Sequence, residues 1–243
     1  MRYGVKIFES ENSLDMKSMR YLKTYKVFES SDPYKDLKEV ILDKCQPFIE
    51  LSKSCDIAIG LWRGVSQDFI RTKSKEVCYL TYEVSHISNR KPTDTPNILH
   101  DRLNKEFKNK FGWPVRNGVF CLPDKGIAQT YASISSDKLN KFDYPEPYFF
   151  IPIGEFKYCW SPKYHDLTAD IKVKGENWKD EMESLSDIKI KNIVNTYKDT
   201  DISDANYNTY KRKDASEISF NCDKYLLISQ RYFVSKGFDF WNW

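Results

Sequence analysis

The stretch IAIGLWRGV, residues 57–65, is the part of the sequence on which the expected fold depends. Its apolar residues are typical of a buried strand, and the run ends in a tryptophan, an arginine and a glycine. Such a strand would carry the charge of Arg63 to the rim of the core. Arg63 is then either an ordinary surface arginine or the anion-binding half of a site whose other half lies far along the chain. Later stretches favour the second reading.

Length and composition indicate a single globular domain. The chain has 243 residues, of which 40% are hydrophobic and 15% aromatic, enough to bury a full core. A net charge of +3 is too small to indicate a nucleic-acid binder. Residues 1–31 show no clean period, so their order is left open, and one domain is placed at 32–243. No run is long enough for a signal peptide or a membrane span, which predicts a soluble protein inside a cell or packaged in a particle.

Cysteine and histidine spacing argues against disulfides and metals. The six cysteines are widely scattered without a CxxC pair, which is typical of reduced thiols in the cytosol. The three histidines, His86, His100 and His165, are far apart and lack the paired spacing of metal ligands. We therefore expect no metal site.

The first half of the chain carries clear signals for helices and strands. Asp32 and Pro33 predict a helix start, and Pro47 should kink or end that helix. Leucine and phenylalanine at four-residue steps predict a helix after Pro96 that stops at Gly112. The remaining predicted elements are strands at 77–84 and 118–122 and a small-residue helix at 126–132.

The second half predicts a hairpin, a helix, a loop and two final strands. Residues 148–160 form two apolar runs around Gly154, as in a hairpin or a bent strand pair, and an amphipathic helical segment extends from Trp178 to Val194. Residues 198–214 lack an apolar face and predict a solvent-exposed loop. After it, ASEISFN and KYLLISQRYFV read as strands separated by a turn at Cys222-Asp223.

In this order the elements resemble the ADP-ribosyltransferase family. There, an arginine on the first strand, often followed by glycine, grips the phosphates and ribose of NAD, and Arg63 with Gly64 matches it. The family's second motif is a strand followed by a helix with an alanine and an aromatic, and GVFCLPDKGIAQTY is similar to it. The third is a catalytic glutamate that opens a strand after a target-recognition loop, and SEISFNCDKYLLI matches it with Glu217.

The resemblance implies roles for particular residues. Glu217 would be the catalytic carboxylate and Arg63 the cation for the pyrophosphate, while the loop at 198–214 would recognise the target. The full set of implied NAD contacts is Arg63, Gly64, Phe120, Cys121, Tyr131, Arg116 and Arg90, and the implied target contacts are Tyr207 and Tyr210. Taken alone, Glu217 also reads as a solvated strand-edge charge, and Tyr131 and Phe120 as core aromatics.

The chain departs from the family pattern at two places. Cys121-Leu122-Pro123 stands where the family has a Ser-Thr-Ser cluster, and Ala215 stands two residues before Glu217, where a glutamate or glutamine helps to select the target. These departures disfavour an arginine-directed transferase of the usual kind. A different acceptor, plain NAD hydrolysis and a degenerate site stay open.

The sequence thus predicts an α+β fold with a mixed or antiparallel β-sheet core, split into two packed sheets, with peripheral helices and NAD in the cleft between the sheets. RKPTDTP, the Phe-Gly helix end and IPIGEFKYCWSP also resemble small ADP-ribosyltransferase-like proteins of tailed bacteriophages. The implied function is transfer of ADP-ribose from NAD to a host macromolecule, a protein rather than a nucleic acid, in the host cytoplasm or after packaging in the virion. The alternatives are an NAD glycohydrolase and a non-catalytic virion or interaction protein that keeps the fold.

Overall fold

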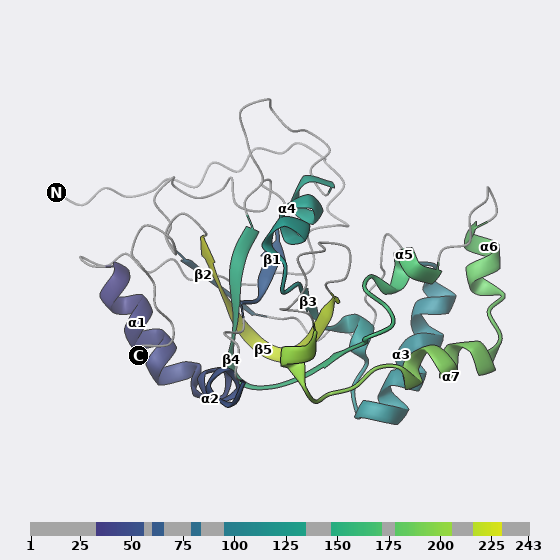
Figure 1. The fold of residues 1–243 in the computed structure, drawn as a ribbon, viewed down its shortest axis with the longest axis horizontal. Helices are drawn as coiled ribbons and strands as arrows, with labels where there is room; N and C mark the ends of the chain where they lie inside the picture. The colour runs from purple at the N-terminus through teal and green to yellow at the C-terminus, as the bar shows by residue number, and fades with distance from the viewer. Residues whose placement is uncertain are drawn as a thin grey trace, which may run out of the picture.

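The computed structural model describes residues 33–55, 60–65, 79–83, 95–134, 147–171, 178–205 and 216–229. These residues form an α+β fold built on a five-stranded sheet in which every strand pair is antiparallel. The sheet runs in the order β1 (Trp62–Gly64), β4 (Pro147–Trp160), β5 (Ile218–Ser229) and β2 (Tyr79–Glu83), and β3 (Val119–Cys121) also pairs with β5. The β5 strand is therefore central (Figure 1), and β3 and β2 share one of its edges.

The sheet curls so far that β1 lies beside the end of β3. Trp62 and Leu122 exchange backbone hydrogen bonds of 2.7 and 2.8 Å, so the end of β3 lies beside β1 as well as beside β5. Our expectation of two packed sheets is therefore wrong for the described residues, because all five strands belong to one sheet. The curl brings the Arg63 strand next to the β3 strand and its partner β5.

Two long strands replace two expected turns. Residues 147–160 are one continuous strand rather than a hairpin, and Cys222-Asp223 lies inside β5 rather than in a turn. Gly154 has φ of +72°, and the register between β4 and β5 shifts between Ile153 and Phe156. Gly154 thus forms a bulge that bends β4 without reversing it, because glycine serves equally well in a bulge and in a turn.

The helices lie where the sequence patterns place them, with local differences. The described helices are α1 (Pro33–Lys44), α2 (Gln46–Ser54), α3 (Asn97–Phe111), η2 (Val115–Asn117), α4 (Lys125–Ile134), α5 (Leu167–Ile171), α6 (Trp178–Glu183), α7 (Asp187–Asn195) and η3 (Ile202–Asp204). The helix start at Pro33 is confirmed, and Pro47 lies in the first turn of α2, where a missing N–H is tolerated. Gly112 ends α3 with φ of +78°, as expected. The single helical segment expected from Trp178 to Val194 is wrong, because it divides into α6 and α7.

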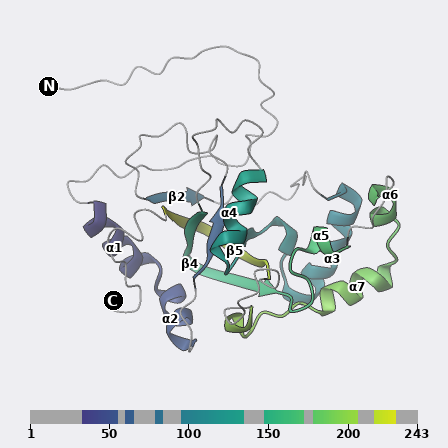
Figure 2. The same cartoon turned by 45° about the horizontal axis from the view of Figure 1, so that its top comes forward.

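Two hydrophobic clusters divide the interior. One joins the sheet to α1 and α2, and the other joins α3, α5, α6 and α7 around Phe107, Trp113 and Cys159. Figures 1 and 2 both show α1 and α2 at one end of the molecule and these four helices at the other, with α4 above the sheet. The β4 strand runs from the sheet toward the four helices. The candidate site around Glu217 lies where the two parts meet.

The polar stretch after α7 is more ordered than its composition suggests. We expected residues 198–214 to be solvent-exposed. Asp199, Thr200, Asp201 and Asp204 are exposed as expected, but Ile202 and Ala205 are buried against the sheet. Lys198 also forms a β-bridge with Trp160. The two buried apolar residues, the bridge and a 2.9 Å hydrogen bond from Trp160 Nε1 to the Thr200 carbonyl oxygen hold this polar segment. In the described part of the chain, no helix has the length and apolar character that a membrane crossing needs.

Candidate functional site

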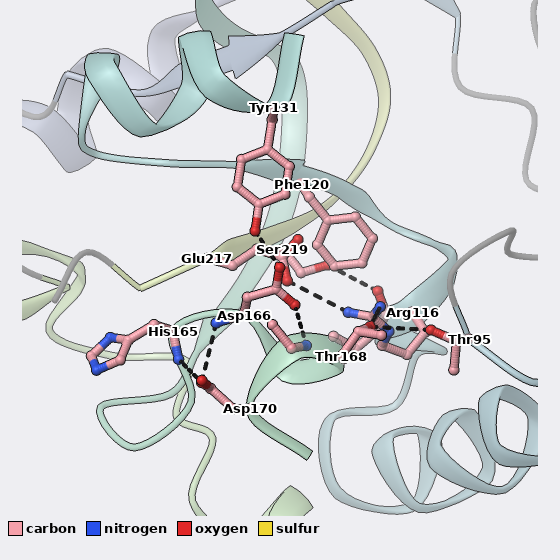
Figure 3. A network of polar contacts seen from close by, with 12 residues as sticks. Thr95, Arg116, Phe120, Tyr131, His165, Asp166, Thr168, Asp170, Glu217 and Ser219 are labelled. Carbon is pink, nitrogen blue, oxygen red and sulfur yellow. Dashed lines mark hydrogen bonds and ion pairs between the residues drawn. The ribbon is translucent and has the colours of Figure 1, made fainter. Parts of the chain in front are cut away.

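Glu217 stands immediately before β5, in the backbone position expected of it. Its N–H donates a 2.8 Å hydrogen bond to the carbonyl oxygen of His165, which fixes the backbone at the start of the strand. Its carboxylate Oε2 lies 3.5 Å from Nη1 of Arg116 (Figure 3). The Glu217 side chain is 20% exposed and that of Arg116 only 8%, so a solvent-accessible carboxylate lies next to a buried cation.

Arg116 is held by contacts from three directions. Its backbone N–H donates to Asn104 Oδ1 of α3 at 2.8 Å, and its Nη2 donates to Thr168 Oγ1 of α5 at 3.3 Å. Its guanidinium lies over the ring of Phe120, 4.7 Å from the centroid. A planar cation in this setting makes several directional contacts at once, and so fixes both the ring and the carboxylate beside it.

Tyr131 and Asp166 form a second polar pair next to Glu217. The Tyr131 hydroxyl of α4 donates a short hydrogen bond to Asp166 Oδ2, as Figure 3 shows. Asp166 is itself fixed, because its Oδ1 accepts a 2.9 Å hydrogen bond from the N–H of Ala169. Burial, the bond to Asp166 and the charges of Asp166 and Glu217 all raise the pKa of Tyr131. The phenol is therefore a neutral hydrogen-bond donor at physiological pH, and the residue as a whole is 37% exposed.

Arg63 approaches the same region from β1. Its Nη1 donates a 2.6 Å hydrogen bond to the carbonyl oxygen of Phe120, and Phe120 is the register partner of Ser219 on β5. The charges of both Arg63 and Glu217 act on the neighbouring Cys121. Burial raises the pKa of its thiol most, Arg63 lowers it, and Glu217 is among the groups that raise it. The curl of the sheet thus brings Arg63 and Glu217 to one short strand.

The remaining expected residues divide into those nearby and those outside the described chain. Gly64 pairs with Pro147 at the edge of β1. Cys121 is 1% exposed within the core, so its thiol is a neutral interior group rather than a replacement for an exposed hydroxyl. The Ser219 hydroxyl donates a 2.9 Å hydrogen bond to the carbonyl oxygen of Val115. Arg90, Tyr207 and Tyr210 lie outside the described residues.

The structure also brings in polar residues that sequence reasoning did not assign to the site. Thr168 bonds to Arg116 and lies 3.1 Å from the hydroxyl of Thr95, and Asp170 accepts a 2.7 Å hydrogen bond from the N–H of His165. An aspartate after the β4 strand is most often a cap or turn former, and Asp166 and Asp170 both do cap backbone N–H groups. Their local signals therefore describe a turn and give no indication of the site.

The site is a set of one buried and one half-buried arginine, a partly exposed carboxylate, two aromatic rings and a fixed aspartate. Within the described ranges, no group of three or more His, Cys, Asp or Glu side chains lies close enough together to hold a metal ion. In comparisons with known proteins, no family model, curated protein or solved structure matches the chain. What the site can do is therefore argued from its chemistry.

Proposed function

We propose that the chain is an NAD-dependent ADP-ribosyltransferase of phage type, which transfers ADP-ribose from NAD to a host macromolecule, a protein in preference to a nucleic acid. One observation supports the proposal most. Arg63 and Glu217 are 154 positions apart in the sequence, yet both lie beside the short β3 strand: Arg63 donates to the Phe120 carbonyl oxygen, and Ile218, which follows Glu217, pairs with Cys121. A cation for a pyrophosphate and a carboxylate for a ribose are needed together in such a reaction.

The chemistry requires a negative charge beside the sugar. The bond between C1′ of the nicotinamide ribose and the nicotinamide nitrogen breaks, and its electron pair leaves with nicotinamide, which becomes neutral. Positive charge then develops on the ribose ring, and a fixed carboxylate stabilises it where it appears. A nucleophile of the acceptor forms the new bond to C1′ and loses its proton to solvent. Glu217, 3.5 Å from Arg116 and still 20% exposed, suits this role.

The neighbouring groups suit the other parts of NAD. The partly exposed guanidinium of Arg63 supplies several donors for a pyrophosphate, which a lysine would match less well. Tyr131 is 37% exposed and would offer an aromatic ring to nicotinamide, and its hydroxyl is held by Asp166, so the ring has little freedom to turn away. Arg116 takes the orienting part that a serine or threonine hydroxyl plays in the family, because it contacts the carboxylate directly.

The test uses NAD labelled in its ADP-ribose half, incubated with the purified protein and host lysate. The controls are Glu217→Gln, which keeps the shape of the side chain, and Glu181→Gln, which removes an exposed carboxylate on α6. Label should appear on a macromolecule with the native protein and Glu181→Gln and be lost with Glu217→Gln. Nicotinamide release without labelled macromolecule would identify a glycohydrolase instead. No release above the Glu217→Gln background would leave the non-catalytic alternative.

A further inference from the structure

Ser216 and Glu217 lie next to the sheet but outside its register of paired residues. The pairs that β5 makes begin at Ile218. The two residues before Ile218 form hydrogen bonds instead with residues 161–166, the connecting segment between β4 and α5. On its N-terminal side, the backbone at Glu217 is therefore fixed by this connecting segment and not by a neighbouring strand.

Two hydrogen bonds join the start of β5 to the connecting segment. The Ser216 hydroxyl donates a 2.8 Å bond to the carbonyl oxygen of Ser161. The Glu217 N–H donates a bond of the same length, 2.8 Å, to the carbonyl oxygen of His165. Ser216 is only 2% exposed, so water has little access to replace its bond. Because this bond comes from a side chain, a single substitution removes it and leaves the backbone unchanged.

The connecting segment is itself held at both ends. Oγ of the fully buried Ser161 accepts hydrogen bonds of 3.1 and 3.2 Å from the N–H groups two and three positions later. At the other end, the Asp170 carboxylate accepts bonds of 2.7 and 3.3 Å from the N–H groups of His165 and Asp166 (Figure 3). Asp166 in turn accepts the hydroxyl of Tyr131. The segment therefore fixes the backbone of Glu217 relative to the ring of Tyr131.

The hydroxyl of Ser216 thus acts on the residue that carries the proposed catalytic charge. We propose that Ser216 is a positioning residue, whose bond to Ser161 holds the Glu217 carboxylate in its place beside Arg116. Ser216 makes and breaks no bond in the reaction. The inference rests on the proposed transferase function, because a misplaced carboxylate stabilises the developing charge less. A serine that served stability alone would leave the contact between Glu217 and Arg116 unchanged.

The first experiment measures nicotinamide release from NAD by Ser216→Ala. We expect kcat to fall about tenfold or more while KM stays within about twofold, because the carboxylate moves and the rest of the site still binds NAD. The control is Ser186→Ala, which removes the side-chain cap of α7 and also costs stability. It should leave kcat within about twofold. Ser216→Cys keeps the volume with a weaker donor, and it carries the test if the alanine variant does not fold.

The second experiment contains no NAD and is therefore independent of the transferase reaction. Urea unfolding of the two single variants and the double variant gives the coupling between Arg116→Met and Glu217→Gln. The cycle is then repeated with Ser216→Cys in every chain. We expect about half of the coupling or more to be lost, because the carboxylate is no longer held 3.5 Å from the guanidinium. With Ser186→Ala in every chain, the coupling should stay the same.

The two experiments separate this inference from the proposed function. An unchanged coupling in the Ser216→Cys background would overturn the inference, and so would a Ser216 variant whose KM rises while kcat stays native. A reduced coupling together with no nicotinamide release by the native protein would support the positioning of Glu217 by Ser216 and refute only the transferase function.

Discussion

Replacing Arg116 by methionine should destabilise the protein far more than removing a surface ion pair. The substitution keeps most of the apolar stem but takes away the cation 3.5 Å from Glu217, the hydrogen bond to Thr168 and the contact over Phe120. Breaking a buried ion pair from one side costs about 3–5 kcal/mol. Because Glu217 is 20% exposed and can be partly hydrated, we expect about 2–3 kcal/mol here.

The assay is urea unfolding followed by tryptophan fluorescence, which gives the free energy of unfolding of each variant. The control is Asp187→Asn, which removes the exposed partner of Arg102 and should leave that free energy within experimental error. The double variant Arg116→Met/Glu217→Gln should recover about 1 kcal/mol or more, because the unpaired carboxylate is then gone. A cost for Arg116→Met no larger than that for Asp187→Asn would refute the reasoning that this arginine supports Glu217.

Three further predictions concern packing, pH and the second polar pair. Gly118→Ala should lower the free energy of unfolding by about 1–3 kcal/mol in thermal unfolding, because the new Cβ would lie 2.6 Å from Oγ of Ser219. Gly60→Ala, whose Cβ would have its nearest atom at 3.3 Å, should cost less. Equal costs for the two variants would contradict this. Desolvation lowers the pKa of His100 below 6.5 in the folded chain. As the pH first falls below 6.5, His100 therefore gains a proton only in the unfolded chain. The free energy of unfolding should decline from there until the pH reaches the lower folded-state pKa. His100→Gln should flatten the decline below about pH 6.5 in urea unfolding, and an unchanged slope would show that His100 is not the cause of the decline. Tyr131→Phe loses the bond to its aspartate and should lower the free energy of unfolding by about 1 kcal/mol, while an unchanged value would mean that the bond contributes nothing.

The parts of the fold that the sequence predicted well have local causes. The α3 helix follows from leucine and phenylalanine at four-residue steps and from Gly112, whose positive φ of 78° ends it. The start at Pro33 follows from the fixed φ of proline. In each case the deciding residues lie within the element itself. That Arg63 and Glu217 belong to one site was predicted from the order of motifs, which is a property of the whole chain, and it stays a prediction.

The features that escaped prediction depend on distant partners. Gly154 gives the same local signal in a bulge as in a hairpin, and only the length of β5 beside it decides between them. The contact of Arg116 with Glu217 joins positions 101 residues apart, and the sequence around Arg116 gives no signal for its partner. Residues 198–205 look like a free loop because Ile202 and Ala205 are too sparse to show a period.

The most direct test of the proposed function is the rate of nicotinamide release from NAD by the purified protein. The native chain should release nicotinamide, and Arg63→Met and Glu217→Gln should each reduce kcat/KM about 100-fold or more, because each removes a charge fixed near the developing charges. The double variant should be little slower than the worse single variant, since both residues serve one site. No release by the native protein, or an undiminished rate in Glu217→Gln, would contradict the assignment.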